Sequence, residues 1–130
     1  MSRAPREAPI YVATHDLLGW LVPHLEGWPR PQRFLLARQV LDSATRFYQL
    51  ILRARKVAGP VRAGALVEAD VELETLKALI RLGQERHYMT LGQYEHVSRL
   101  LVNIGRQLGG WRASTDGQLA RQGREPNHGS

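Results

Sequence analysis

The sequence predicts an all-α protein, an up-down antiparallel four-helix bundle. Apolar residues recur every three or four positions through four segments, which is the spacing of one face of a helix. Short connectors separate these segments, and no segment shows the apolar–polar alternation that is typical of a strand. The length of 130 residues suits a single domain with a real hydrophobic core. Helices joined by short connectors pack as antiparallel neighbours, so a bundle is the expected architecture.

The chain opens with a polar, proline-containing stretch, residues 1–11, which we expect to be a flexible lead-in. A first helix is expected to start near Thr14, because Thr is a usable N-cap and Asp16 then falls in the first turn. Four leucines share a face of this helix: Leu17, Leu18, Leu21 and Leu25. Pro23 lies inside the segment and would meet the carbonyl of Gly19, so a kink or break is expected there.

The chain is organised around its second helical segment, Pro31 to Arg55. Pro31 suits the first turn of a helix, and Gly59-Pro60 predicts that the helix stops before that pair. The first apolar stripe is Phe34, Ala37, Leu41, Ala44, Tyr48 and Ile51. A second stripe beside it is Leu36, Val40, Phe47 and Leu50. The basic face opposite the first stripe, within about a quarter of the circumference, is Arg38, Arg46, Arg53 and Lys56.

A third helix is predicted over roughly Arg62 to Arg86. Its core face is Leu66, Ala69, Leu73, Leu76 and Ile80. One side of this helix carries charged residues of both signs: Asp70, Glu74, Lys77, Arg81 and Glu85. This pattern is typical of a solvated ladder of ion pairs, each of which stabilises the helix by a few tenths of a kcal/mol. A second apolar stripe beyond the ladder is Val67, Val71, Ala78 and Leu82.

A fourth helix is predicted to start at Thr90-Leu91-Gly92-Gln93, which has the spacing of a capping box. Its apolar face is Tyr94, Val97, Leu101, Ile104 and Leu108. Gly109-Gly110 is expected to end it. Residues 113–130 are rich in Gly, Gln, Arg and Ser, so we expect a disordered tail after a bundle domain of residues 12–112.

The second and third helices each carry a second apolar stripe. A bundle that buries only one face of each helix would leave these stripes exposed to solvent, so the pattern favours a homo-oligomer in which another copy of the chain buries them.

Positive charge is concentrated in one part of the chain. The net charge is +6, and the segment from Arg30 to Arg62 holds eight basic residues against one acid, Asp42. Such a segment indicates a polyanion partner, and a solubilising surface is the alternative. Basic side chains spaced along one helix would bind phosphates in a salt-sensitive, largely sequence-independent way.

Several function classes find no support in the sequence. The chain has no cysteine, which excludes disulfides, thiolate metal sites and a cysteine nucleophile. The five histidines show no ligand spacing such as HExxH, and the serines, glycines and acids form no catalytic motif. We expect no enzyme activity, metal, cofactor or small-molecule substrate. No secretory signal or membrane span is visible, so we expect a soluble cytoplasmic protein without a membrane partner.

Three tryptophans, Trp20, Trp28 and Trp111, are expected at helix ends. Aromatic rings beside Arg can stack on bases of single-stranded nucleic acid, but packing at the ends of a bundle is their more frequent role.

The ordered set of segments resembles a known family of small four-helix bundles. Asp16 to Glu26 (DLLGWLVPHLE), followed by Pro29-Arg30 and Arg33-Phe34, is similar to the opening of that family. This family includes the rRNA intervening-sequence proteins and the accessory variability determinant (Avd) of diversity-generating retroelements. Leu73 to Lys77 and Leu79 to Leu82 are similar to its third helix, and Gln93 to Glu95 and Ile104 to Trp111 to its fourth. The resemblance covers roughly Tyr11 to Trp111, with Lys77 standing where many members have Arg.

The resemblance implies a homopentameric barrel with a basic surface and no known catalytic activity. Avd associates with the reverse transcriptase and template RNA, and supports adenine-mutagenic cDNA synthesis and retrohoming. We therefore expect a non-catalytic accessory protein whose partners are a reverse transcriptase, template RNA, cDNA and further copies of itself. The expected phosphate contacts are Arg38, Arg46, Arg53, Arg55, Lys56 and Arg62, with Lys77 and Arg81 as secondary candidates.

Two alternatives stay open at this point. A self-assembling scaffold could use the basic face to bind an acidic protein, without any nucleic-acid role. A metal-dependent nuclease would require a ligand cluster that the sequence does not reveal.

Overall fold

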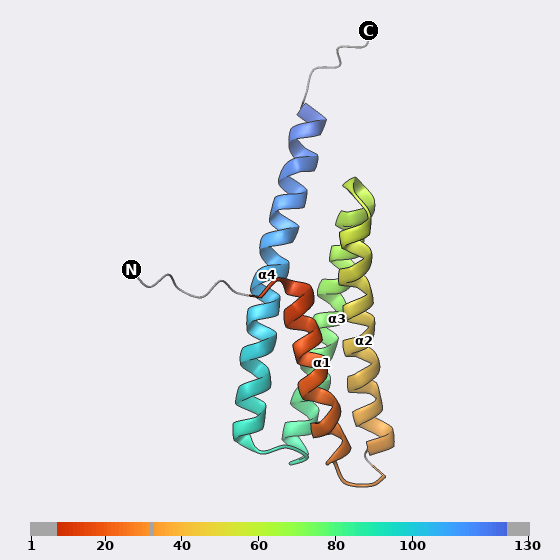
Figure 1. The fold of residues 1–130 in the computed structure, drawn as a ribbon, viewed down its shortest axis with the longest axis vertical. Helices are drawn as coiled ribbons and strands as arrows, with labels where there is room; N and C mark the ends of the chain where they lie inside the picture. Colours follow the sequence, from red (N-terminus) through yellow and green to blue (C-terminus); the bar gives the residue numbers. More distant parts are fainter. Residues whose placement is uncertain (1–7, 32, 125–130) are drawn as a thin grey trace, which may run out of the picture.

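The computed structural model describes residues 8–31 and 33–124, which form helices joined by short connectors and contain no strand. The elements are α1 (Ile10–Glu26), a π-helical turn η1 (Arg33–Ala37), α2 (Arg38–Lys56), α3 (Gly59–Glu85) and α4 (Leu91–Arg124). The helices alternate in direction, and each packs mainly against two neighbours in the cyclic order α1, α2, α3, α4 (Figure 1). The predicted all-α, up-down four-helix bundle is confirmed.

The hydrophobic core runs along the bundle axis and takes side chains from all four helices. Its largest fully buried members include Leu17, Leu21, Phe47, Ile51, Leu66, Leu73, Leu76, Ile80, Ile104 and Leu108. The predicted core face of α3 is buried along its whole length, from Leu66 to Ile80. Removal of this apolar surface from water is the main favourable term in folding.

Helix α1 begins earlier than the sequence predicted. Thr14 is not an N-cap; it is buried inside the helix, and its hydroxyl donates a hydrogen bond of 2.7 Å to the Ile10 carbonyl. The predicted lead-in was therefore wrong at Ile10 and Tyr11, which are helical, while residues 1–7 lie outside the described residues. The helix also continues without a break through Pro23, whose exposed position leaves the freed Gly19 carbonyl on the solvent side.

The side of α2 that faces the core lies between the two predicted apolar stripes and contains residues of both. Val40 and Phe47 of the second stripe are fully buried, as are Ala44 and Ile51 of the first. The prediction that the second stripe of this helix is spare was therefore wrong. Phe34 was also wrongly predicted as core: it lies in η1, at the far edge of its stripe, and its side chain is 69% exposed.

Helix α3 carries a stripe of uncovered apolar side chains. Val67, Val71 and Leu82 of its second stripe are 48%, 61% and 43% exposed, although they recur at helical spacing as a core face does. Helix α3 is therefore apolar on two opposite sides, and the bundle covers one of them.

At the lower end of the bundle in Figure 1, the α1–α2 connector is fixed by Trp28, which is only 3% exposed. The indole ring lies over Gly83 of α3, where a Cβ would come within 2.5 Å of the ring carbon Cη2. The Tyr88 ring packs beside it, with ring centroids 5.4 Å apart. Glycine at position 83 is what allows α3 and the connector to approach so closely.

The α3–α4 turn is closed by two capping motifs. His87 has a φ of 62°, and the amides of His87 and Tyr88 donate to the carbonyls of Gln84 and Gly83, as in a Schellman motif. The predicted capping box is confirmed, because the Gln93 amide donates to Thr90 Oγ1 and the Thr90 amide donates to Gln93 Oε1.

At the opposite, upper end, α2 stops at Lys56 and α3 starts at Gly59. The sequence correctly predicted that the second helix ends before Gly59-Pro60, but α3 starts three residues before the predicted Arg62. Gly59 has a φ of 61°, a left-handed conformation that favours glycine, and Pro60 lies in the first turn of α3, where its missing N–H removes no helical hydrogen bond.

Helix α4 does not end at Gly109-Gly110, and this prediction was wrong. It continues to Arg124 and runs past the start of α1 (Figure 1). The extension is held by packing: Thr115 is 3% exposed, and the Arg112 guanidinium lies 3.1 Å from the Asp70 carboxylate of α3. Tertiary contacts outweigh the low helix propensity of the glycines. The predicted disordered tail was therefore wrong for residues 113–124, and residues 125–130 lie outside the described residues.

Within the described residues, no helix combines the length and the apolar character that a membrane crossing requires.

Candidate nucleic-acid interface

The predicted basic face of α2 lies on the outside of the bundle. Arg38, Arg46, Arg53 and Lys56 are all exposed, because the opposite side of the helix carries Val40, Phe47 and Ile51 into the core. The four side chains follow the helix from its first residue to its last. They differ in what surrounds their charge.

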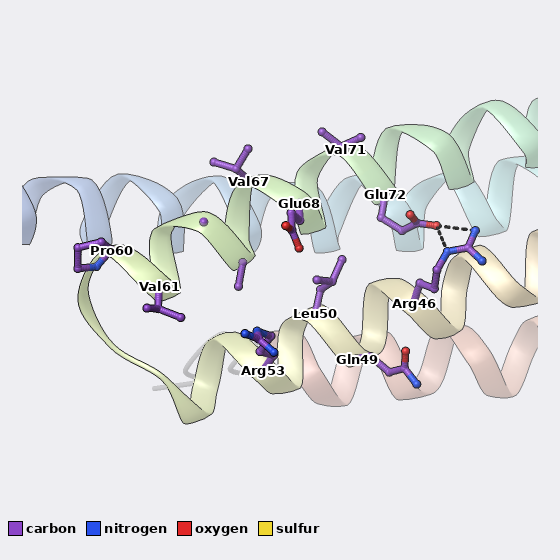
Figure 2. Close-up of a pocket in the computed structure, with 12 residues that line it drawn as sticks. Arg46, Gln49, Leu50, Arg53, Pro60, Val61, Val67, Glu68, Val71 and Glu72 are labelled. Atoms are coloured by element: carbon purple, nitrogen blue, oxygen red, sulfur yellow. Dashed lines mark hydrogen bonds and ion pairs between the residues drawn. The ribbon is translucent and has the colours of Figure 1, made fainter.

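Two of these arginines are paired with carboxylates. Arg38 Nε lies 3.9 Å from Asp42, one turn further along the helix. Arg46 makes a closer contact across helices, with Nε and Nη2 both 3.1 Å from Glu72 Oε1 of α3 (Figure 2). Each pair is partly exposed, so it contributes little stability, but the carboxylate offsets the positive field that a phosphate would meet.

The secondary candidates on α3 are paired as well. Lys77 Nζ lies 3.4 Å from Glu74, and Arg81 Nε lies 3.0 Å from Glu85. The predicted ion-pair ladder is confirmed for these two pairs, while Asp70 pairs with Arg112 of α4 instead. The ladder therefore presents alternating charge, which favours polyanions less than a run of unpaired cations does.

The cations at the upper end have a different environment. The Arg55 guanidinium carbon lies 3.8 Å from the centre of the Tyr11 ring of α1. Arg62 donates from Nε to the Ala54 carbonyl at 2.8 Å, and its guanidinium carbon is 5.9 Å from the centre of the Trp111 ring of α4. Arg62 thereby satisfies one of the last carbonyls of α2, which a helix end leaves without an intrahelical partner. These contacts orient the two side chains without neutralising them.

Four cations are thus gathered around the α2–α3 turn: Arg53, Arg55, Lys56 and Arg62. Within the described part of the chain, none of the four forms an ion pair with a carboxylate. Arg53, Arg55 and Lys56 also lie in the last turn of α2, where the negative end of the helix dipole stabilises positive charge. The eight predicted residues therefore separate into four paired cations and a group of four, hereafter the upper cation cluster.

The structure adds two exposed arginines that the sequence reading assigned to a disordered tail. Arg121 and Arg124 lie in the last turns of α4, at the same end of the bundle as the α2–α3 turn (Figure 1). A signal for this extension was present in the sequence. Leu108, Trp111, Thr115 and Leu119 continue the helical spacing of the α4 core face. The high glycine content masked that continuity.

A groove of about 910 Å³ lies between α2 and α3, next to the upper cation cluster (Figure 2). Leu50, Val61, Val67 and Val71 give it an apolar lining. Arg53 and Glu68 lie along it, and the Arg46–Glu72 pair lies toward its far end. The groove is continuous with the exposed stripe of α3, so it is an open apolar surface rather than an enclosed site for a small molecule.

The described residues contain no group of three His, Asp or Glu side chains placed to hold a metal ion. His24 instead stacks on Trp20, with ring centroids 3.7 Å apart and planes inclined by 13°, and His96 approaches the same ring at 5.5 Å. Trp28 is buried, and Trp111 lies within α4 rather than at its end. Trp111 therefore combines partial exposure with a neighbouring arginine, the arrangement relevant to nucleic-acid binding.

Comparison with known proteins identifies the family. No curated protein matches the chain. A crystal structure of a protein of unknown function from the S23 ribosomal protein family of Bacteroides thetaiotaomicron VPI-5482 has the same fold, with a TM-score of 0.72 at 19% sequence identity. The match covers 79% of this chain and 97% of that one. Residues 10–115, most of the chain, match the model of the bAvd-like family. This agrees with the resemblance seen in the sequence, and the chain belongs to the bAvd-like family.

Proposed function

We propose that this protein is a non-catalytic accessory subunit of a diversity-generating retroelement. It binds template RNA and cDNA through the upper cation cluster, and it associates with the reverse transcriptase to support mutagenic cDNA synthesis and retrohoming. Family membership supports the role, and the cluster supports the chemistry. The observation that carries the proposal is the group of Arg53, Arg55, Lys56 and Arg62 at one end of the bundle, without carboxylate partners among the described residues.

Electrostatic binding of this kind depends on the release of counterions from the nucleic acid. Each phosphate neutralised by a Lys or Arg side chain contributes a slope of about −0.7 to −0.9 to the plot of log affinity against log salt concentration. Four cations in the cluster would give a steep total dependence and little dependence on sequence.

Self-assembly is the second part of the proposal. The exposed stripe of α3 would be covered by another copy of the chain, and a pentamer is the assembly that the family resemblance implies. In a closed ring, each copy contributes one upper cation cluster, so that weak phosphate contacts add up along one nucleic acid.

The proposal is tested by the affinity of the purified protein for a structured RNA, measured across a range of salt concentrations. Tight binding at low salt that is lost steeply at high salt supports it. The protein is then mixed, with and without the same RNA, with the reverse transcriptase of a diversity-generating retroelement, and co-purification is the readout. A protein that binds neither RNA nor the polymerase at low salt contradicts the proposal.

The assembly is tested with Val71→Asp, which places a charge on the exposed stripe of α3 without touching the core. Light scattering is expected to show that the mass falls from an oligomer to a monomer, because an interface does not readily bury an unpaired carboxylate. Leu91→Asp is the matched control, because Leu91 is similarly exposed but lies in the first turn of α4. A wild-type protein that is already monomeric contradicts the assembly.

A further inference from the structure

Arg55 lies over an aromatic ring. Its guanidinium carbon lies 3.8 Å from the centre of the Tyr11 ring, well within the distance of a cation–π contact. Tyr11 is half-buried at the start of α1, whereas Arg55 is exposed. The ring therefore covers one side of the guanidinium group, and the contact orients the side chain before any ligand arrives. Arg53, two residues earlier, is exposed and has no aromatic ring contact among the described residues.

Arg62 is oriented by different means. Its Nε–H donates to the carbonyl of Ala54, the residue before Arg55, at 2.8 Å. Its guanidinium carbon lies 5.9 Å from the centre of the Trp111 ring. One nitrogen is occupied by this backbone contact, which leaves the terminal nitrogens of the fork for a ligand. Two arginines from different helices are thus pre-oriented beside aromatic rings at one end of the bundle.

A phosphate requires none of this arrangement. A Lys ammonium binds a phosphate as a point charge, and an Arg fork binds it through directional N–H bonds at its edge, so neither contact uses the face of the guanidinium plane. A nucleobase benefits from the arrangement, because its flat π face stacks on a guanidinium plane as it does on an aromatic ring. Bases paired in a duplex are already stacked on their neighbours, whereas those of a single strand are accessible.

We infer that the upper cation cluster recognises single-stranded nucleic acid, with unpaired bases stacking on the guanidinium of Arg55 and that of Arg62 while Arg53 and Lys56 contact phosphates. This inference rests on the proposed function. It adds that Arg55 and Arg62 contact bases, whereas Arg53 and Lys56 contact phosphates. Tyr11 and Trp111 are positioning residues, which act on the nucleic acid through the arginines.

The test compares three labelled probes of equal length at one low salt concentration: a single strand without self-complementarity, a fully paired duplex, and a strand of abasic sugar-phosphate units. The abasic strand carries the phosphates of the single strand but none of its bases. The wild-type protein is expected to bind the single strand at least about fivefold more tightly than the abasic strand, which is the lower end of the range for one base stack.

Arg55→Lys keeps the positive charge but removes the planar guanidinium group. It is expected to abolish most of the preference for the single strand over the abasic strand while leaving the affinity for the abasic strand unchanged. Arg53→Lys is the matched control and is expected to leave the preference intact. Tyr11→Leu retains an apolar side chain but removes the supporting ring, and is expected to lower the preference in the same direction as Arg55→Lys. Thermal melting verifies that each variant is folded.

The outcomes separate the inference from the proposed function. Equal affinity of the wild type for the single strand and the abasic strand overturns the inference and leaves electrostatic binding in place. An equal loss of preference in Arg53→Lys and Arg55→Lys also overturns it, because the effect would then be unrelated to stacking. Absence of binding to all three probes contradicts the proposed function itself.

Discussion

The lower end of the bundle in Figure 1 is closed by Trp28, which packs into the space left by Gly83, and by two capping motifs in the α3–α4 turn. The upper end has a single tight turn, the four cations of the upper cation cluster and a glycine-containing extension of α4. Two arginines near the lower end are paired with carboxylates, Arg38 with Asp42 and Arg81 with Glu85. The four residues of the upper cation cluster form no ion pair with a carboxylate among the described residues.

The two ends of the bundle therefore differ in role: the lower end contributes mainly to stability, and the upper end presents charge to a ligand. Close packing and satisfied helix ends contribute stability, and they leave few groups available for binding. Cations gathered without carboxylates repel one another, and a bound polyanion would compensate that repulsion. Substitutions at the lower end should therefore change stability, and substitutions at the upper end should change binding.

The largest stability effect is expected for Gly83→Ala. The new Cβ would lie 2.5 Å from Trp28 Cη2 and 2.9 Å from Cζ2, and the buried indole has little room to move. Overpacking of this kind costs about 1–3 kcal/mol of the free energy of unfolding. Urea denaturation, monitored by circular dichroism, measures it.

Gly109→Ala is the matched control. Gly109 is an exposed residue inside α4, with no atom within 4 Å of the position that a Cβ would take. This variant should gain up to about 1 kcal/mol, because Ala has the higher helix propensity. Equal effects of the two substitutions would show that Trp28 does not fill the space over Gly83 as described.

A smaller loss is expected for Thr90→Ala, which removes the side-chain acceptor of the Gln93 amide. Loss of an N-cap costs about 1 kcal/mol, and the reciprocal bond from the Thr90 amide to Gln93 Oε1 limits the damage. The same denaturation experiment applies, with Thr90→Ser as a control that retains the hydroxyl. A loss in Thr90→Ser as large as that in Thr90→Ala would contradict the capping role.

The smallest change is expected for His87→Gly, and it is a gain. His87 has a φ of 62°, which costs a residue with a Cβ about 1 kcal/mol relative to glycine. The greater freedom of glycine in the unfolded chain offsets part of this gain. The midpoint of thermal unfolding should rise slightly, and a fall would contradict the Schellman geometry.

The sequence predicted the parts of the fold that depend on local pattern. The core face from Leu66 to Ile80, the capping box at Thr90 and the end of the second helix before Gly59 all follow from spacing and residue type. It failed where tertiary packing decided the outcome. Thr115 and the Arg112–Asp70 pair carry α4 past two glycines, against local propensity.

The sequence indicated which residues could form the candidate site, but it did not indicate how they are arranged or which of them are paired. The spacing of Arg38, Arg46 and Arg53 placed them correctly on one outer face, but it gave no information about partners on other helices. Glu72 and Tyr11 lie far away in the chain from Arg46 and Arg55, so the distinction between paired and unpaired cations requires the fold.

The most direct test of the account compares two variants that each remove two positive charges. Arg53→Gln with Lys56→Gln removes them from the upper cation cluster, and Arg38→Gln with Arg81→Gln removes them from paired sites at the lower end. RNA affinity is measured against salt concentration for both variants and for the wild type. The upper variant is expected to lose affinity at low salt and to reduce the salt slope by about two, whereas the lower variant should differ little from wild type. Equal losses in the two variants would contradict the assignment of nucleic-acid binding to the upper end.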